Sequence, residues 1–334
     1  MTSFDGSKLT DTRTITVKDA GLSAITLPQS SKLCELNLSD NNFTSFDLSP
    51  YSGLVALSLN NNRLTTLDLS NNSNLQVASA SGNKLSNVVL NNPNLWALYV
   101  GDNQLKSISF DNALSLQQIE LSHNLLTTLD VGKLSQLRAL AIDNNYFRFS
   151  TLPAVKSAYT VYYYQPQASI EVAPVEGVID LASEAEISGV ATTYRWYLDM
   201  PVVNPDTGEL EGEELIEDTE YSIDGGVTRF MTPIDNVMCV MTNGSFPNMY
   251  QYTNLFDVKE AGVDDVAAED VNAVVKGRNI IISTPSVATA RLYSVSGALM
   301  RSTACSAGES VIAAVEPGIY VLSVGKAVFK VIVK

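Results

Sequence analysis

The sequence has few of the residues on which catalytic and metal sites depend. Its three cysteines, Cys34, Cys239 and Cys305, lie far apart and form no C-x-x-C pair, so neither a disulfide framework nor a zinc site is indicated. We expect them to be buried as small hydrophobic residues. There is a single histidine and no glycine-rich phosphate loop. These absences exclude the common sequence signatures of an enzyme.

Basic charge and long apolar runs are also scarce. The formal net charge is −15, and no stretch combines clustered Lys or Arg with aromatic residues, which argues against a nucleic-acid partner. No apolar run approaches the ~18 residues of a transmembrane helix. Residues Met1 to Leu9 lack the basic start and apolar core of a signal peptide, and a leader removed before Met1 stays an alternative. With 45% hydrophobic residues, the chain is folded protein of two or three domains.

Asparagine recurs at a fixed interval through the N-terminal half of the chain. The intervals are 21, 21, 20, 21 and 21 residues, and each asparagine stands in much of the same frame, L-x-x-L-x-L-x-x-N-x-L-x-x-L-x-L. A degenerate unit precedes them, in which Ala20 replaces the asparagine, as is typical of an end repeat. The six repeating residues are Asn41, Asn62, Asn83, Asn103, Asn124 and Asn145.

The frame has a direct structural meaning. Its L-x-L alternation places two side chains inward on a short strand, and a second apolar pair returns the chain across the core. One repeat cannot bury its own core, so repeats stack, and the asparagine amide satisfies the backbone of a buried turn. The pattern resembles the leucine-rich-repeat family, and Phe46 to Ser49 (FDLS) and Leu67 to Ser70 (LDLS) resemble internalin-type repeats. The resemblance implies a solenoid over residues 12–153.

After Pro153 the period stops and short β-rich segments begin, the first being Tyr159 to Tyr164. Turn signals at Pro205 to Gly208 and Asp224 to Gly226 separate the later ones, which predicts a small antiparallel sandwich over residues 155–262. Trp196 and Cys239 resemble the core tryptophan and second cysteine of an immunoglobulin-like domain. The first cysteine of that family is absent, so the prediction is an immunoglobulin-like sandwich in the general sense.

An acidic linker, Asp264 to Asp270, leads to a last β-domain over residues 271–334, with turns at Ser296-Gly297 and Gly325-Lys326. This segment has seven Lys and Arg against two Asp and Glu, a net charge of +5, which leaves −20 for residues 1–270. Its segments resemble the C-terminal sorting domain of the type IX (Por) secretion system. The resemblance implies export across a bacterial outer membrane and attachment to the cell surface through that machinery. A plain β-sandwich module is the alternative. The segments concerned are Leu292 to Gly297, Pro317 to Leu322 and Phe329 to Lys334.

Two groups of residues are candidates for sites of chemistry. His123 stands at a variable turn position of the repeat, where other repeats have Asp, Asn or Gly, and no nucleophile is paired with it in the sequence. An acidic run in the middle domain lacks the regular spacing of a calcium loop and is interpreted as a solvated hairpin tip. We therefore predict no catalysis, no metal and no cofactor. The acidic run comprises Glu209, Glu211, Glu213, Glu214, Glu217 and Asp218.

The predicted binding site is the concave face of the solenoid. Residues on either side of the inward leucine point to this exposed face, on seven strands that span ~29 Å at ~4.8 Å per strand. Most of these residues are small. Tyr99, with Trp96 close by, is the expected aromatic anchor of the site. The alternative is that both rings only cover neighbouring strands. The candidate ligand-binding residues are Glu35, Asn37, Ser58, Trp96, Tyr99, Gln118 and Glu120.

Together these features predict a mainly β protein, a leucine-rich-repeat solenoid followed by two small β-sandwich domains. The function expected is that of a bacterial cell-surface or secreted binding protein, an adhesin or receptor, whose partner is a protein or a glycan. A structural envelope protein without a dedicated ligand is the alternative. Binding of the solenoid to cells or glycans distinguishes the two.

Overall fold

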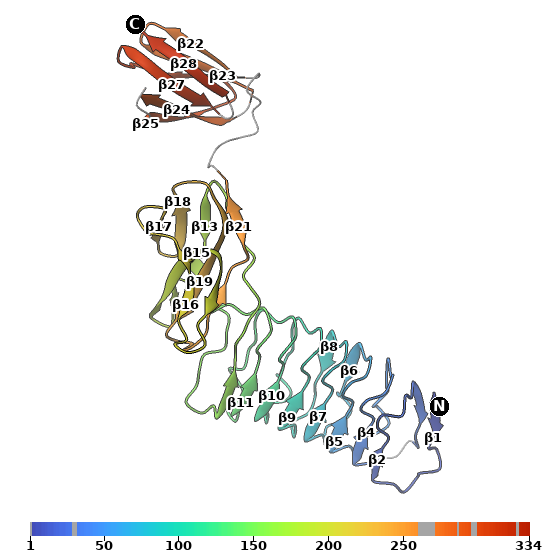
Figure 1. Cartoon of the computed structure of the whole chain (residues 1–334). Helices are drawn as coiled ribbons and strands as arrows, with labels where there is room; N and C mark the ends of the chain where they lie inside the picture. The colour runs from blue at the N-terminus through green and yellow to red at the C-terminus, as the bar shows by residue number, and fades with distance from the viewer. Residues whose placement is uncertain (1, 29–31, 260–270, 286, 295–298, 325–326) are drawn as a thin grey trace.

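The computed structural model describes residues 2–28, 32–259, 271–285, 287–294, 299–324 and 327–334. In these ranges the chain is built from β-strands, with one 3-10 turn, η1 (Ala182–Glu184), and no α-helix. Figure 1 shows a solenoid followed by two β-sandwiches in chain order. No helix in the described ranges is long and apolar enough to cross a membrane. The predicted linker at 264–270 and the turns at 296–297 and 325–326 lie outside the described residues.

One face of the solenoid is an eight-stranded parallel sheet. Each strand is three residues long and pairs with the strand one repeat away, so that Leu57 lies opposite Leu36 on one side and Ala78 on the other. The middle residue points into the core, and the flanking residues point out. The strands are β2 (Thr14–Thr16), β4 (Glu35–Asn37), β5 (Ala56–Ser58), β7 (Val77–Ser79), β9 (Ala97–Tyr99), β10 (Gln118–Glu120), β11 (Ala139–Ala141) and β12 (Val161–Tyr163).

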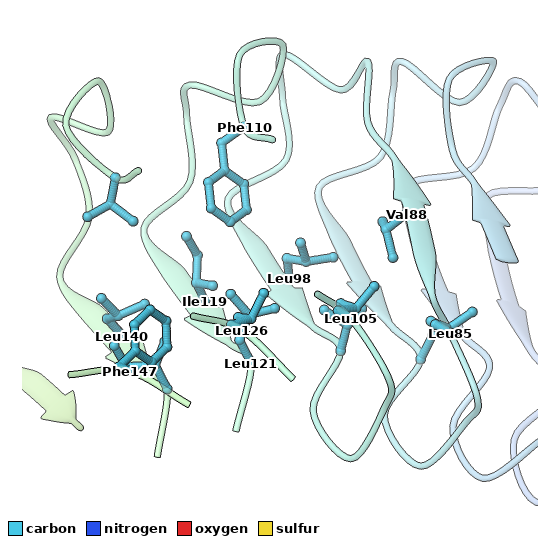
Figure 2. Close-up of a cluster of buried hydrophobic side chains, with 14 of the residues drawn as sticks. Leu85, Val88, Leu98, Leu105, Phe110, Ile119, Leu121, Leu126, Leu140 and Phe147 are labelled. Carbon is cyan, nitrogen blue, oxygen red and sulfur yellow. The ribbon is translucent and has the colours of Figure 1, made fainter. Parts of the chain in front are cut away.

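The return segments of the repeats close the solenoid on its other side. Two short parallel pairs form there, β1 (Ser3–Asp5) with β3 (Ala24–Thr26) and β6 (Thr66–Asp68) with β8 (Asn87–Val89). Between the two sides lies a core of leucine and other apolar residues that are almost fully buried. Figure 2 shows successive repeats contributing equivalent side chains to this core, such as Leu98, Ile119 and Leu140 from the eight-stranded sheet.

The prediction for the segment Tyr159 to Tyr164 was wrong. Its composition suggested the first strand of the sandwich, but β12 extends the parallel sheet of the solenoid, with Tyr162 opposite Leu140. The half-buried Tyr162 takes the inward position that Leu, Ile or Ala has in the other repeats. The predicted sheet of seven strands therefore has eight.

A glutamine replaces the asparagine in this last turn. The Gln167 Nε2 donates to the carbonyl oxygens of Ile142, at 2.9 Å, and Tyr164, at 2.8 Å. Its Oε1 accepts from the N–H groups of Asn145, at 3.1 Å, and Phe147, at 3.3 Å. Gln167 thus makes the contacts that an asparagine makes in earlier repeats. The 21-residue asparagine pattern could not show this, because the residue type and the spacing both change.

The middle domain is a sandwich of two antiparallel sheets. Trp196 is completely buried between them, packed edge-on against Phe230 with 4.9 Å between ring centroids. Cys239 lies opposite Trp196 on the neighbouring strand as a free thiol, and burial raises its pKa. The strands are β13 (Val178–Asp180), β17 (Tyr221–Asp224) and β18 (Val227–Phe230) in one sheet, and β14 (Glu186–Ile187), β15 (Val190–Val203), β16 (Leu210–Glu214), β19 (Ile234–Asn243), β20 (Gln251–Tyr252) and β21 (Phe256–Val258) in the other.

This sandwich closes the end of the solenoid. The buried Gln251 side chain donates to the Phe147 carbonyl at 2.7 Å and accepts from the Phe149 N–H at 3.0 Å. The fully buried Glu184 carboxylate accepts from the Ser150 N–H and hydroxyl. Apolar residues of solenoid and sandwich form one continuous core. The two parts are therefore packed as one body.

The last domain has a separate core between two antiparallel sheets. Alternating residues of its final strand point inward, as Val331 does, and outward, as Lys330 does. The strands are β22 (Asn272–Lys276), β23 (Asn279–Thr284) and β26 (Gly308–Ile312) in one sheet, and β24 (Ala288–Ser294), β25 (Leu299–Cys305), β27 (Gly318–Val324) and β28 (Ala327–Val333) in the other.

Candidate functional site

The candidate site is the outer face of the eight-stranded sheet, the surface predicted to be concave. We call it the sheet face. It consists of the first and third residues of every strand, and at ~4.8 Å per strand it is ~34 Å long. Its residues are Thr14, Thr16, Glu35, Asn37, Ala56, Ser58, Val77, Ser79, Ala97, Tyr99, Gln118, Glu120, Ala139, Ala141, Val161 and Tyr163.

Small and polar side chains cover the N-terminal half of the sheet face. Glu35 is exposed and accepts a hydrogen bond from the Thr14 hydroxyl at 3.3 Å, while Asn37 accepts from the Ser39 N–H at 3.0 Å. Ser58 is half-buried beside them. These groups leave a shallow surface with hydroxyl and amide groups but no aromatic residue.

The predicted anchor Tyr99 lies on the central strand β9 and is half-buried. Its hydroxyl donates to the Gln118 Oε1 on the next strand at 2.6 Å. Trp96, one residue before β9, is also half-buried. The structure therefore brings Tyr99 and Gln118 together as one hydrogen-bonded pair, which holds the tyrosine ring in place on the face.

Glu120 has a structural role within the face. Its two oxygens accept from the Gly101 N–H at 2.9 Å and the Ser122 N–H at 2.8 Å. A Cβ at position 101 would lie 2.2 Å from the Glu120 Oε2, so only glycine leaves room for the carboxylate. Because both oxygens satisfy backbone donors, Glu120 has less capacity to bind a ligand than its sequence position suggested.

The sequence prediction missed the most exposed aromatic residue on this face. Tyr163 of β12 is 62% exposed and Val161 of the same strand is 37% exposed. The tyrosine-rich run Tyr162-Tyr163-Tyr164 was their signal in the sequence, but its composition predicted a strand of the sandwich and not of the solenoid. Tyr163 stands in one row with Ala141 and Tyr99 through the strand register, three strands from Tyr99, which is ~14 Å at ~4.8 Å per strand.

The six asparagines of the repeat lie inside the turns, each less than 10% exposed. At Asn83 the Nδ2 donates to the carbonyl oxygens of Leu59, at 2.9 Å, and Ala80, at 3.0 Å, and the Oδ1 accepts from the Leu64 N–H at 3.0 Å. Equivalent bonds link the other turns. The asparagines therefore join consecutive repeats through their backbones, which fixes the spacing of the sheet face.

A second, shorter row of asparagines was not anticipated. Asn72 and Asn92 are completely buried on the return side. The Asn72 Nδ2 donates to the Leu48 carbonyl at 3.0 Å, and the Asn92 Nδ2 donates to the Leu69 carbonyl at 3.0 Å. The repeated N-N-x-N-L motif at 71–75 and 91–95 was their signal in the sequence.

The structure gives a conformational reason for the position of His123. Its φ is 54°, and the equivalent residues Asp40, Asn61, Gly82, Asp102 and Asn144 also have positive φ. Left-handed backbone favours Gly, Asn and Asp, and His tolerates it. The exposed His123 ring contacts the Asn144 side chain through its Nε2 at 3.2 Å.

The acidic run of the middle domain begins just before β16, continues along it and ends in the turn after it, and Glu209, Glu211, Glu213 and Glu217 are exposed. Glu214 forms an ion pair with Arg195. Over the ranges that the structure covers, no three His, Cys, Asp or Glu side chains are grouped to hold a metal ion.

Comparison with known proteins gives matches of fold only. No known family and no curated protein matches the sequence. Similar solved structures include YopM from Yersinia enterocolitica WA-314, at 22% identity over 48% of this chain and 43% of that one, with a TM-score of 0.38. The functional domain of InlJ from Listeria monocytogenes is 16% identical over 76% of this chain and 69% of that one, with a TM-score of 0.34. The Listeria monocytogenes internalin-like protein lmo2027 is 14% identical over 73% and 80%, with a TM-score of 0.34.

The match spans less than half of YopM. Structural similarity at these TM-scores does not indicate what this chain binds. The strand pairing confirms the predicted fold class, a mainly β protein with a leucine-rich-repeat solenoid followed by two β-sandwich domains.

Proposed function

We propose that the chain is a cell-surface or secreted binding protein, an adhesin or receptor, whose ligand lies across the C-terminal half of the sheet face. The observation that carries this proposal is Tyr163, a tyrosine with 62% of its surface exposed on a face where many residues are small. Exposed aromatic residues on a rigid surface give large contact area at low entropic cost.

The strand next to Tyr163 presents small residues on the sheet face. On β11 the sheet face has only the half-buried Ala139 and Ala141, and the longer side chains of Gln118 and Val161 flank them on β10 and β12. The two small residues of β11 thus lie between longer side chains, and Tyr99 and Tyr163 stand ~14 Å apart on the same face at ~4.8 Å per strand. A protein loop or a short glycan has suitable dimensions to contact both tyrosines.

Each of the two sandwiches has its own role in the proposed function. The middle domain, proposed to be immunoglobulin-like, holds the solenoid through Gln251 and Glu184 and acts as a spacer. The last domain, with its own core and its charge of +5, is proposed to direct export and surface attachment through the type IX secretion machinery. The protein would then present the sheet face outside the bacterial outer membrane.

The test is an array of glycans and extracellular-matrix proteins probed with the whole chain. Isolated residues 12–153 are unsuitable, because removing the sandwich exposes the solenoid core and leaves the Phe149 N–H without its Gln251 partner. Any ligand found is then titrated against the parent, Tyr163→Ala and the control Ser58→Ala. The proposal expects a ligand whose affinity falls only for Tyr163→Ala. An array without ligands, or equal affinity for all three proteins, refutes it.

A further inference from the structure

Several strands in the described residues stand at the edge of their sheet, and two of these edges, on β16 and β28, carry opposite charge. In the described residues β16 pairs only with β15, and β28 pairs only with β27. An open strand edge presents unpaired N–H and C=O groups that can pair with another chain. The charge on each edge decides which partner it accepts.

The β16 edge is acidic. Glu211 and Glu213 project from the same side of this strand and are exposed. Figure 1 shows β16 on the flank of the middle sandwich. Beside it on β15, Val202 lies opposite Glu211 and is 67% exposed, and the neighbouring Met200 is 66% exposed. The edge therefore combines negative charge with apolar surface.

The β28 edge is basic. Its outward side chains are Val328, Lys330 and Ile332, and the two apolar ones are 67% and 51% exposed. Ile319 on β27 lies opposite Ile332 and continues the apolar surface. No ion pair within the described residues occupies Lys330. The whole domain has a net charge of +5, against −20 for residues 1–270.

Charge selects between the possible pairings of these edges. Two β16 strands side by side would place glutamates against glutamates, and two β28 strands would place Lys330 against its copy, both unfavourable. Pairing β16 with β28 sets Lys330 against Glu211 or Glu213. Repulsion in the like pairs and attraction in the unlike pair give specificity for the latter.

We propose that copies of this protein associate head to tail, with β28 of one copy adding antiparallel to the β16 edge of the next. The contact is heterologous, so each copy keeps one free edge of each kind and the assembly grows as an open chain. The sheet face of the solenoid takes no part in the contact. The inference is therefore independent of the proposed ligand.

The test is sedimentation velocity of the whole chain over a range of concentrations. At ~0.1 M salt, where screening acts over ~10 Å, we expect the weight-average mass to rise with concentration above the 36.0 kDa monomer. At ~1 M salt, where the screening length is ~3 Å, we expect the mass to return to the monomer value. A monomer at every concentration at low salt refutes the proposal, and so does an assembly that salt does not weaken.

Charge-swap variants identify the edges. Lys330→Glu alone and the double variant Glu211→Lys/Glu213→Lys alone should each stay monomeric, because each then has two edges of the same sign. Mixed together they should assemble into alternating chains, because each edge of one variant then meets an edge of opposite sign on the other. The control Lys276→Glu, an exposed residue of β22 with the same charge change, should assemble like the parent. A mixture that stays monomeric, or a control as defective as Lys330→Glu, overturns the assignment of the edges. Circular dichroism of each variant establishes that it is folded.

Discussion

Replacing Asn83 with alanine tests how the solenoid is held together. The change removes four hydrogen bonds: three from the Nδ2 to the carbonyl oxygens of Leu59, Ala80 and Ser81, and one from the Leu64 N–H to the Oδ1. The Leu64 N–H is buried and loses its acceptor. One unsatisfied buried group costs about 1 to 3 kcal/mol, and because the orphaned groups belong to two repeats we expect a loss of about 3 kcal/mol.

Urea unfolding of the whole chain, followed by circular dichroism, measures this loss. With a denaturant dependence of about 3 kcal/mol per molar urea, the midpoint should fall by about 1 M. The matched control is Asn74→Ala, an exposed asparagine with a single bond, to the Ser52 carbonyl at 3.1 Å, which should change stability by less than about 0.5 kcal/mol. If Asn83→Ala and Asn74→Ala unfold at the same midpoint, the buried amide contributes nothing and the reasoning about the repeat is wrong.

Further predictions address the sheet face, the domain junction and the last domain. Gly101→Ala should destabilise the fold by about 1 to 3 kcal/mol in urea unfolding, and by much less in a Glu120→Ala background, since the new Cβ displaces that carboxylate. Gln251→Ala should cost about 1 to 3 kcal/mol and speed proteolysis near Phe149, whose N–H loses its acceptor; unchanged proteolysis would contradict this. Tyr99→Ala should raise the dissociation constant of a sheet-face ligand roughly thirtyfold without a large change in melting temperature. Deletion of residues 271–334 should abolish surface display in the native host but leave the melting of the remainder unchanged, because the domain has its own core; display at the parental level would exclude the sorting role.

Much of the solenoid was predictable because its signals are local and repeated. The interval between Asn41, Asn62 and Asn83 equals one turn, and each turn faces the same requirement for inward leucines and a buried amide. The same regularity predicted correctly that Gln118 and Tyr99 lie on one face. The same regularity failed to predict the last strand of the solenoid, where the inward residue is Tyr162 in place of leucine.

The amino-acid sequence by itself determined the number of stacked turns from Asn41 to Asn145, the direction of their side chains and the separation of charge between residues 1–270 and 271–334. Tertiary structure alone decided that β12 joins the solenoid, that Gln251 closes it and that Glu120 is held by Gly101. The physical reason is the range of the contacts. A repeat satisfies its core and its backbone with partners about 21 residues away, so a period reveals them, whereas Gln251 and Phe147 are 104 residues apart and meet only when the sandwich packs on the solenoid.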